Sequence, residues 1–257
     1  MNDNQKLNGL SLDTIYNMDC IEGMKSLPDK SIDMILCDLP YGTTQCKWDV
    51  IIPFKDLWEQ YKRIIKDNAA IVLTSAQPFT SLLITSNIEL FKYNWIWEKS
   101  KATGYLNSKK RPMVAHEDVL VFAKKQTKYN PQMVQGEPYY KGKAHRPTDV
   151  YGGQKETLVE NKDGLRYPRT VQYFKTAESE GKVYHPTQKP ISLFEYLIKT
   201  YTDEGDVVLD NCMGSGTTAI ACQNTNRHYV GYEKDEKYFN IINQRLLELS
   251  KIKNNKT

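Results

Sequence analysis

The stretch Val207-Val-Leu-Asp-Asn-Cys-Met-Gly-Ser-Gly-Thr-Thr-Ala219 decides the fold class. An apolar run of strand type ends at Asp210, and the glycine-rich turn 214–216 leads into a segment of helix type. Glycines in such a turn accept positive φ and let a ligand approach the backbone, and a helix N-terminus offers unpaired N–H groups. The pattern fits the loose dinucleotide fingerprint Gly-x-Gly-x-x-Ala. It is not a phosphate-binding P-loop, because no Gly-Lys-Ser/Thr follows.

A second acid supports a ligand site at this turn. Glu233 directly follows the next strand-type run, His228–Tyr232. A carboxylate at the tip of that strand can bind both hydroxyls of a ribose. The glycine turn and Glu233 together predict an adenosine-type cofactor, without identifying which one.

Strand-type and helix-type segments alternate along the chain, which predicts an α/β fold: a Rossmann-like, mostly parallel twisted sheet with helices on both faces. The length of 257 residues suits one large domain with an inserted lobe. The other predicted strands are Ile32–Cys37, Ala69–Thr74, Tyr93–Trp97, Val119–Ala123 and Asp206–Asp210. The predicted helices are Phe54–Lys66, Phe79–Thr85, Ile191–Tyr201, Thr217–Gln223 and Glu236–Ser250, the last with a core stripe of Phe239, Ile242, Leu246 and Leu249.

The composition is that of a soluble globular protein. Apolar residues make up 40% and charged residues 26% of the chain. No apolar run approaches the length of a membrane span, and the N-terminus lacks the apolar stretch of a signal peptide, so we expect a cytoplasmic protein. Five cysteines without a Cys-x-x-Cys pair predict free thiols. The four histidines have no metal-ligand spacing, so no metal site is predicted.

Basic residues gather in one part of the chain. The net charge is only +4, but between residues 92 and 128 nine lysines and arginines face three acids. Such an excess suits a phosphate backbone. The alternative is an ordinary solvated face.

Residues 127–184 interrupt the α/β pattern. A stretch this long without periodic apolar residues is usually functional or disordered. Basic and aromatic residues alternate in it, as nucleic acid contacts require. We interpret it as an inserted recognition lobe rather than a surface loop, on the evidence of Tyr139, Tyr140, Tyr151, Tyr167 and Tyr173 beside Lys141, Lys143, Arg146, Arg166 and Arg169.

Residues 38–41 read Asp-Leu-Pro-Tyr, directly after a strand-type run. A carboxylate at the carboxyl end of a strand lies where open α/β sheets bind ligands. Pro40 stiffens the turn, and Tyr41 offers a stacking face. The segment suits a flat heteroaromatic group whose exocyclic amine donates to Asp38 and to a main-chain carbonyl. From these four residues alone, a capped strand end with a surface tyrosine is an equal alternative.

Four segments together resemble the amino-group DNA methyltransferases. Residues 38–41 resemble their Asp-Pro-Pro-Tyr motif, and residues 210–216 resemble their Asp-Pro-Phe-x-Gly-Ser-Gly cofactor loop. Residues 185–190, His-Pro-Thr-Gln-Lys-Pro, match a third element that lines the cofactor site, and residues 114–124 resemble a segment beside the target-base pocket. The catalytic motif comes first and the cofactor loop last, which is the order of the beta group. The resemblance spans nearly the whole chain.

This resemblance implies a site-specific methyltransferase that moves a methyl group from S-adenosylmethionine to adenine N6 of a base flipped out of double-stranded DNA. It leaves open a homodimer and a cognate restriction enzyme. It implies a catalytic half (1–126), an inserted target-recognition region (127–184) and a cofactor-binding half (185–257). The implied base-holding residues are Asp38, Pro40 and Tyr41. The implied cofactor contacts are Asp19, His185, Thr187, Lys189, Asp210, Cys212, Gly214, Ser215, Gly216, Thr217 and Glu233. The implied DNA contacts are Lys109, Lys110, Arg111 and Arg146.

Two departures from the family pattern bear on these assignments. Leu39 replaces the first proline, which removes one restraint on the turn, and Asn211-Cys212 replaces Pro-Phe on the cofactor side. The leading Asp38 favours adenine N6 over cytosine N4, where the family more often has serine. The alternatives are cytosine N4 methylation by the same fold, a nicotinamide-dependent oxidoreductase, a non-enzymatic DNA-binding module and an RNA target.

Overall fold

The computed structural model describes residues 6–7, 10–144 and 157–254. The chain forms two compact units. Met1–Asn130 and Thr170–Thr257 form the first, and Pro131–Arg169 form the second. We describe each by itself.

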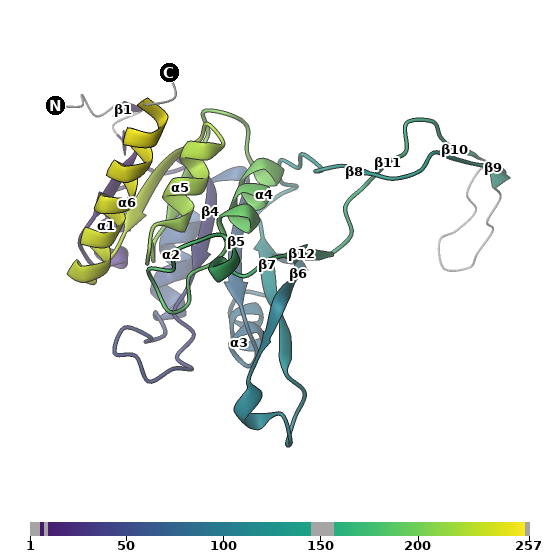
Figure 1. The fold of residues 1–257 in the computed structure, drawn as a ribbon. Coiled ribbons are helices and arrows are strands. Elements are labelled where there is room, and N and C mark those ends of the chain that lie inside the picture. The colour runs from purple at the N-terminus through teal and green to yellow at the C-terminus, as the bar shows by residue number, and fades with distance from the viewer. Residues whose placement is uncertain (1–5, 8–9, 145–156, 255–257) are drawn as a thin grey trace. The chain divides into compact units, whose positions relative to one another are not determined.

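The first unit is built on an eight-stranded sheet (Figure 1). Seven strands run in one direction, and β7 runs antiparallel to both of its neighbours. The mostly parallel sheet expected from the alternating pattern is therefore confirmed. From edge to edge the strands are β12 (Val171–Phe174), β6 (Phe91–Thr103), β7 (Val114–Phe122), β5 (Ile65–Ser75), β4 (Ile32–Asp38), β13 (Val207–Asp210), β14 (His228–Tyr232) and β3 (Thr14–Tyr16).

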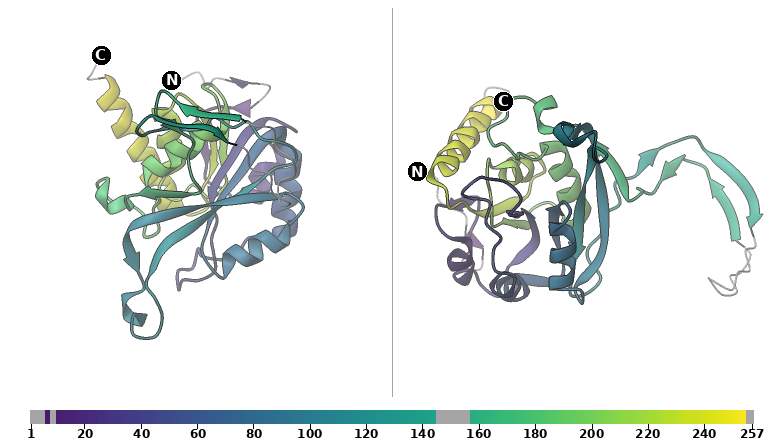
Figure 2. Two further views of the ribbon diagram at one scale, coloured as in Figure 1. Left: turned by 90° about the vertical axis from the view of Figure 1, so that its right-hand side faces the viewer. Right: turned by 90° about the horizontal axis from the view of Figure 1, so that it is seen from below.

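Helices cover both faces of this sheet (Figure 2). Successive residues of β4 show why both faces need cover: Ile35 and Cys37 belong to one buried cluster, and Met34 and Leu36 belong to the other. The first cluster packs under α1 (Cys20–Lys25), α2 (Phe54–Ile64) and α3 (Phe79–Ser86). The second packs under α4 (Ile191–Tyr201), α5 (Thr217–Asn224) and α6 (Glu236–Asn254). Among the described residues, no helix is long and apolar enough to span a membrane.

The sheet order brings separate parts of the sequence together. β4 pairs with β13, and β13 pairs with β14, all parallel. The carboxyl ends of these strands therefore lie at the same edge, with Asp38, Asp210 and the residues after Tyr232 beside one another. These are the acids that the sequence placed at strand ends.

The second unit consists of two short antiparallel pairs. β8 (Val134–Gln135) pairs with β11 (Leu165–Arg166), and β9 (Tyr139–Ala144) pairs with β10 (Thr157–Asn161). The side chains of Lys141 and Arg166 both lie over the Tyr139 ring, at 5.1 and 5.3 Å from its centroid. This unit is shorter than the expected insertion 127–184, because β12 and the η2 turn (Ala177–Ser179) belong to the first unit.

Most predicted elements of the first unit are present with shifted ends. The structure extends β6 by two residues at its start and six at its end, because its partner β7 continues the ladder to Val114. The short elements β1 (Lys6–Leu7), β2 (Leu10–Ser11), β3 and α1 were not predicted. The core stripe of α6 was partly confirmed: Ile242 is buried, and the half-buried Leu246 packs against the same core cluster. Phe239 and Leu249 are only half-buried, and the other buried side chains are Tyr238 and Arg245.

Candidate active site

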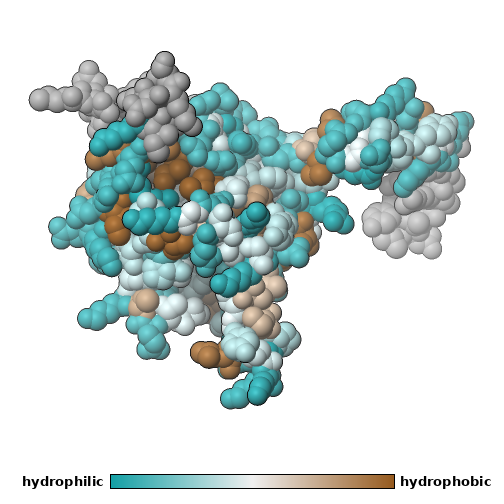
Figure 3. Space-filling view, in the orientation of Figure 1, coloured by the Kyte–Doolittle hydropathy of each residue, from teal (hydrophilic) through white to brown (hydrophobic). Residues whose placement is uncertain are grey.

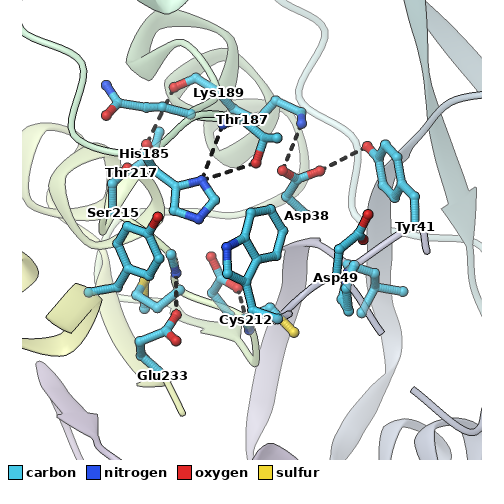
Figure 4. A pocket seen from close by; sticks show the side chains of 18 of the residues that line it. Asp38, Tyr41, Asp49, His185, Thr187, Lys189, Cys212, Ser215, Thr217 and Glu233 are labelled. Atoms are coloured by element: carbon cyan, nitrogen blue, oxygen red, sulfur yellow. Dashed lines mark hydrogen bonds and ion pairs between the residues drawn. The ribbon is translucent and has the colours of Figure 1, made fainter. Parts of the chain in front are cut away.

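A cavity of about 890 Å³ opens at the carboxyl ends of β4, β13 and β14 (Figure 4). It is lined by residues from both halves of the sequence. Every predicted catalytic and cofactor residue lines it except Gly216. The prediction that these residues share one site therefore agrees with the geometry, while the role of each one stays a prediction.

The Asp38 carboxylate is held in place by its neighbours. Its Oδ1 accepts hydrogen bonds from the Tyr41 hydroxyl at 2.8 Å and from the Thr74 hydroxyl at 2.5 Å. Thr74 comes from β5, the strand paired with β4. The carboxylate is thus fixed in direction before any substrate binds.

A buried ammonium holds the other oxygen of this carboxylate. Lys189 Nζ lies 2.7 Å from Asp38 Oδ2 and 3.4 Å from Glu117 Oε2, and its side chain is 7% exposed. Glu117 in turn pairs with Lys99 at 3.3 Å through its other oxygen. Burial lowers the pKa of Lys189, but the charges of Asp38 and Glu117 outweigh it and raise the pKa, so the ammonium stays charged. Charges alternate along the line Lys99–Glu117–Lys189–Asp38.

The Tyr41 ring is fixed as well as its hydroxyl. It stacks on Phe79, with the ring centroids 5.1 Å apart and the planes at 21°. Lys189 Nζ lies 5.5 Å from the Tyr41 centroid. The sequence predicted Tyr41 as a stacking face for a base, but it did not reveal that Phe79 and Lys189 already contact that ring.

Asp210 ties the strand end to the glycine turn. Its carboxylate accepts hydrogen bonds from the Cys212 amide at 2.9 Å and from the Thr218 hydroxyl. Burial raises the pKa of Asp210 to about 6. The neighbouring Asn211 is also buried, and its side chain accepts from Tyr61 at 2.5 Å and donates to Cys20 and Cys212. The side chain that replaces the family's proline therefore has hydrogen-bond partners in the core.

The glycine turn leaves space for a ligand at one position only. At Gly214, with φ +55°, an added Cβ would meet only the Cys212 carbonyl oxygen, at 3.9 Å. At Gly216, with φ +83°, an added Cβ would lie 2.7 Å from Ile242. Gly214 thus lets a bound molecule reach the backbone, whereas Gly216 lets α6 pack closely against the turn.

Glu233 is positioned by the same turn. Its Oε2 accepts from the Gly214 amide at 2.7 Å, and its Oε1 accepts from the Asp235 amide at 2.8 Å. Each carboxylate oxygen has a second lone pair. The carboxylate can therefore still accept hydrogen bonds from the hydroxyls of a ribose, and this role stays a prediction.

Aromatic rings form one wall of the cavity. The His185 ring lies between Trp48, at 4.8 Å, and Tyr238, at 4.3 Å, measured between ring centroids. His185 Nδ1 accepts from the Thr187 amide at 3.2 Å, so its proton is on Nε2. Burial lowers the pKa of His185, which keeps the ring neutral. The sequence missed Tyr238 because its helical position predicts only a surface or core side chain.

Two further acids shape the loops around the cavity. Asp49 accepts hydrogen bonds from the amides of Gly42, Thr43 and Thr44 at 2.7–2.9 Å, which fixes the loop after the Asp-Leu-Pro-Tyr turn. Asp19 caps α1 by accepting from the Ile21 amide at 3.0 Å and also binds Lys234 at 3.1 Å. The role of Asp49 was not predicted, because only the folded loop brings its carboxylate to the amides of residues 42–44.

Of the predicted DNA contacts, the three that the structure describes do not line the cavity. Lys109, Lys110 and Arg111 are exposed at the tip of the β6–β7 hairpin, and Arg146 lies outside the described residues. The five cysteines are free, as predicted.

Comparisons with known proteins agree with this geometry. A family model described as DNA methylase matches residues 32–244. The type II methyltransferase M.HpaI of Haemophilus parainfluenzae is 27% identical over 241 residues, which cover 88% of this chain and 71% of that protein.

Solved structures share the fold. The crystal structure of the M1.HpyAVI–SAM complex has a TM-score of 0.65 and 26% identity and covers 91% of this chain and 98% of that one. The cytosine-N4-specific PvuII DNA methyltransferase also has a TM-score of 0.65, at 16% identity, covering 88% and 83%. That likeness shows a common fold and leaves the target base open.

Proposed function

The chain belongs to the DNA methylase family and is an S-adenosylmethionine-dependent DNA methyltransferase, and we propose that it methylates adenine N6 of a flipped base within a specific double-stranded site. The observation that carries the proposal is the fixed carboxylate of Asp38 at the rim shared with the Gly214 turn and Glu233. Family membership favours this activity over a nicotinamide-dependent oxidoreductase. A cytoplasmic location stays a prediction.

The cofactor would bind at the turn between β13 and α5. Gly214 leaves the backbone open, Glu233 would accept from the ribose hydroxyls, and the neutral His185 with Trp48 and Tyr238 would provide an aromatic wall. When bound, S-adenosylmethionine supplies a sulfonium methyl group that an amine nitrogen can attack directly, with the thioether sulfur as the leaving group. The residues at the turn therefore bind and orient, and none of the free thiols has to act as a nucleophile.

Asp38 would orient the target amine. Its carboxylate accepts a hydrogen bond from the exocyclic N–H, which leaves the nitrogen lone pair directed at the methyl group. The proton that the amine loses can pass to the same carboxylate. Tyr41, Thr74 and Lys189 keep the carboxylate in place, so little reorganisation is needed during the reaction.

The basic hairpin tip and the second unit would hold the DNA. Lys109, Lys110 and Arg111 would contact phosphates, and the Tyr139 ring with Lys141 and Arg166 belongs to the region 127–184 that we propose for target recognition. Changing Arg111 to Ala should weaken DNA binding uniformly and reduce its salt dependence. Unchanged affinity at moderate salt would exclude a phosphate contact at this residue.

Modification mapping tests the target base and the sequence together. DNA from cells that express the protein is sequenced by a long-read method that detects modified bases, and its nucleosides are then analysed. We expect N6-methyladenine at one sequence motif. If only N4-methylcytosine is found, the target base is cytosine and not adenine. If the DNA is unmodified and the RNA is methylated, the substrate is RNA.

The variant Asp38→Ala tests the site. It should lose methyl transfer by at least about 100-fold and keep its affinity for S-adenosylmethionine in calorimetry. Transfer at the normal rate would show that Asp38 does not hold the amine.

A further inference from the structure

The tip of the β6–β7 hairpin exposes apolar side chains to an unusual degree. Strand pairing ends at Thr103 and Val114, and the residues between them form the tip. Leu106 is 96% exposed and Tyr105 is 77% exposed. In Figures 1 and 2 this hairpin projects beyond the edge of the sheet, and Figure 3 shows apolar and hydrophilic residues side by side at its end. The described residues of the first unit leave these two side chains largely uncovered.

The backbone of the tip is nevertheless ordered by its own hydrogen bonds. Residues Tyr105–Asn107 form a 3₁₀ turn that begins after Gly104, whose φ is +89°. The Asn107 amide donates to the Gly104 carbonyl at 3.0 Å, and the amides of Lys110 and Arg111 donate to the Asn107 carbonyl at 2.8 and 3.0 Å. The apolar side chains are therefore held outward by a formed turn, and little backbone freedom is lost when they are buried by a partner.

Cations directly follow the apolar pair. Lys109, Lys110 and Arg111 are exposed, and no carboxylate of the described residues lies within ion-pair distance of them. By contrast, Lys99 in the stem of the same hairpin is paired with Glu117. A surface with unpaired cations beside exposed Tyr and Leu fits a partner that is anionic outside and apolar inside. Duplex DNA, with phosphates around stacked bases, has this character.

The stem of the hairpin connects the tip to the active site. Thr103 of β6 and Glu117 of β7 line the same cavity as Asp38. Leu106 follows Thr103 by three residues, so their Cα atoms are at most about 11 Å apart. That reach equals roughly three base steps of 3.4 Å. The tip therefore begins within about three base steps of a residue that lines the cavity.

We infer that Tyr105 and Leu106 form a wedge that enters the base stack beside the target base and fills the space left when this base flips, while Lys109, Lys110 and Arg111 hold the flanking phosphates. The inference rests on the proposed function, since it requires a flipped base. Flipping breaks stacking and pairing. Burial of Leu106 and stacking of Tyr105 in the gap offset that loss, because both side chains leave water.

Single-turnover methylation by Leu106→Ala on two duplexes tests the wedge. The first duplex carries the mapped site with normal pairing, and the second carries the same site with an abasic position opposite the target base, so that pairing is already lost. We expect a loss of roughly tenfold or more on the paired duplex and recovery of most of that loss on the unpaired one. The fluorescence of 2-aminopurine at the target position should also rise less with the variant than with the natural protein.

The matched control is Ile88→Ala, since Ile88 is also exposed but lies outside the hairpin. It should behave as the natural protein on both duplexes. Lys110→Ala should lose affinity equally for both duplexes, because a phosphate contact does not depend on pairing. Calorimetry with S-adenosylmethionine checks that each variant is folded.

Two results would overturn the wedge: normal rates of Leu106→Ala on both duplexes, or equal loss on both. Loss of self-association by Leu106→Ala in sedimentation, with normal 2-aminopurine fluorescence, would assign the tip to a second copy of this chain instead. These outcomes differ from failure of the proposed function, in which the natural protein itself would methylate neither duplex.

Discussion

The ammonium of Lys189 lies 2.7 Å from the carboxylate of Asp38, although 151 residues separate them in the sequence. The contact joins the two halves of the sequence at the point where the target amine would bind. Because Lys189 is buried, its charge acts on Asp38 with little screening by water. Its Nζ faces the carboxylate, so its predicted contact with the cofactor stays a prediction.

Replacing Lys189 by Met should reduce kcat by about 10- to 100-fold at pH 7, since a buried charge-assisted hydrogen bond is lost. Asp38 and Glu117 would then have no cation between them, although Glu117 keeps Lys99, and one of the two acids would keep a proton to higher pH. We therefore expect the activity of this variant to recover as the pH is raised. The pH profile of kcat measures this.

The matched control for this prediction is Lys66→Met. Lys66 forms a similar pair with Asp33, at 2.6 Å, away from the cavity. This variant should keep the natural pH profile. A Lys189→Met profile parallel to that of the natural protein would show that Lys189 does not act through Asp38.

Replacing Tyr41 by Phe should lower kcat by roughly tenfold, because Asp38 loses one hydrogen-bond donor while the stacking on Phe79 is kept. The KM for DNA should change little. Tyr41→Ala, which also removes the ring, should have a lower kcat and a higher KM for DNA than Tyr41→Phe. As a control, Tyr93→Phe removes a hydroxyl that binds Tyr201 away from the cavity and should leave both constants unchanged. A normal kcat for Tyr41→Phe would contradict the role of the hydroxyl.

Replacing Asp210 by Asn should stabilise the protein above pH 6. Burial raises the pKa of Asp210 to about 6 from an ordinary value of 3.8, so the folded state binds its proton more tightly than the unfolded state. The contribution of Asp210 to stability is thus largest below pH 4 and is lost as the pH rises through 6. The difference between the two pKa values corresponds to at most about 3 kcal/mol in the free energy of unfolding.

Thermal unfolding without cofactor, at pH 5 and at pH 8, measures this difference. The Tm of Asp210→Asn should exceed that of the natural protein more at pH 8 than at pH 5. In the variant the Asn oxygen can accept from the Cys212 amide, and the Asn NH2 group can donate to the Thr218 hydroxyl, which donates to Asp210 in the natural protein, so the fold is expected to be kept. A Tm difference that does not vary with pH would show that Asp210 is not titrating in this range.

The two glycines of the cofactor turn should respond differently to alanine. Gly216→Ala places a Cβ 2.7 Å from Ile242 at a positive φ, and we expect a loss of about 1–3 kcal/mol in stability. In Gly214→Ala the added Cβ meets no such collision, so this variant should lose less stability than Gly216→Ala. Its loss should be near the roughly 1–2 kcal/mol that left-handed backbone strain costs. It should instead weaken binding of S-adenosylmethionine in calorimetry. Normal cofactor affinity of Gly214→Ala would place the ligand elsewhere in the cavity.

The sequence by itself determined the architecture of the sheet unit and the position of its acids. Apolar runs such as 32–37 and 207–210 are buried on both faces, so their residue types alone require helices on each side. The glycine turn and the acids Asp38, Asp210 and Glu233 follow directly after such runs. Local pattern is sufficient for these features because each depends on neighbouring residues.

The tertiary structure decided how those acids are held and what surrounds them. Thr74, Glu117 and Lys189 reach Asp38 from other strands and loops, and Tyr61 reaches Asn211 across 150 residues. Strand order sets these contacts, and a single sequence does not state which strands pair. The exposure of Leu106 was hidden for the same reason: an apolar residue after a strand is ordinarily buried, and only the length of the β6–β7 ladder carries it beyond the sheet.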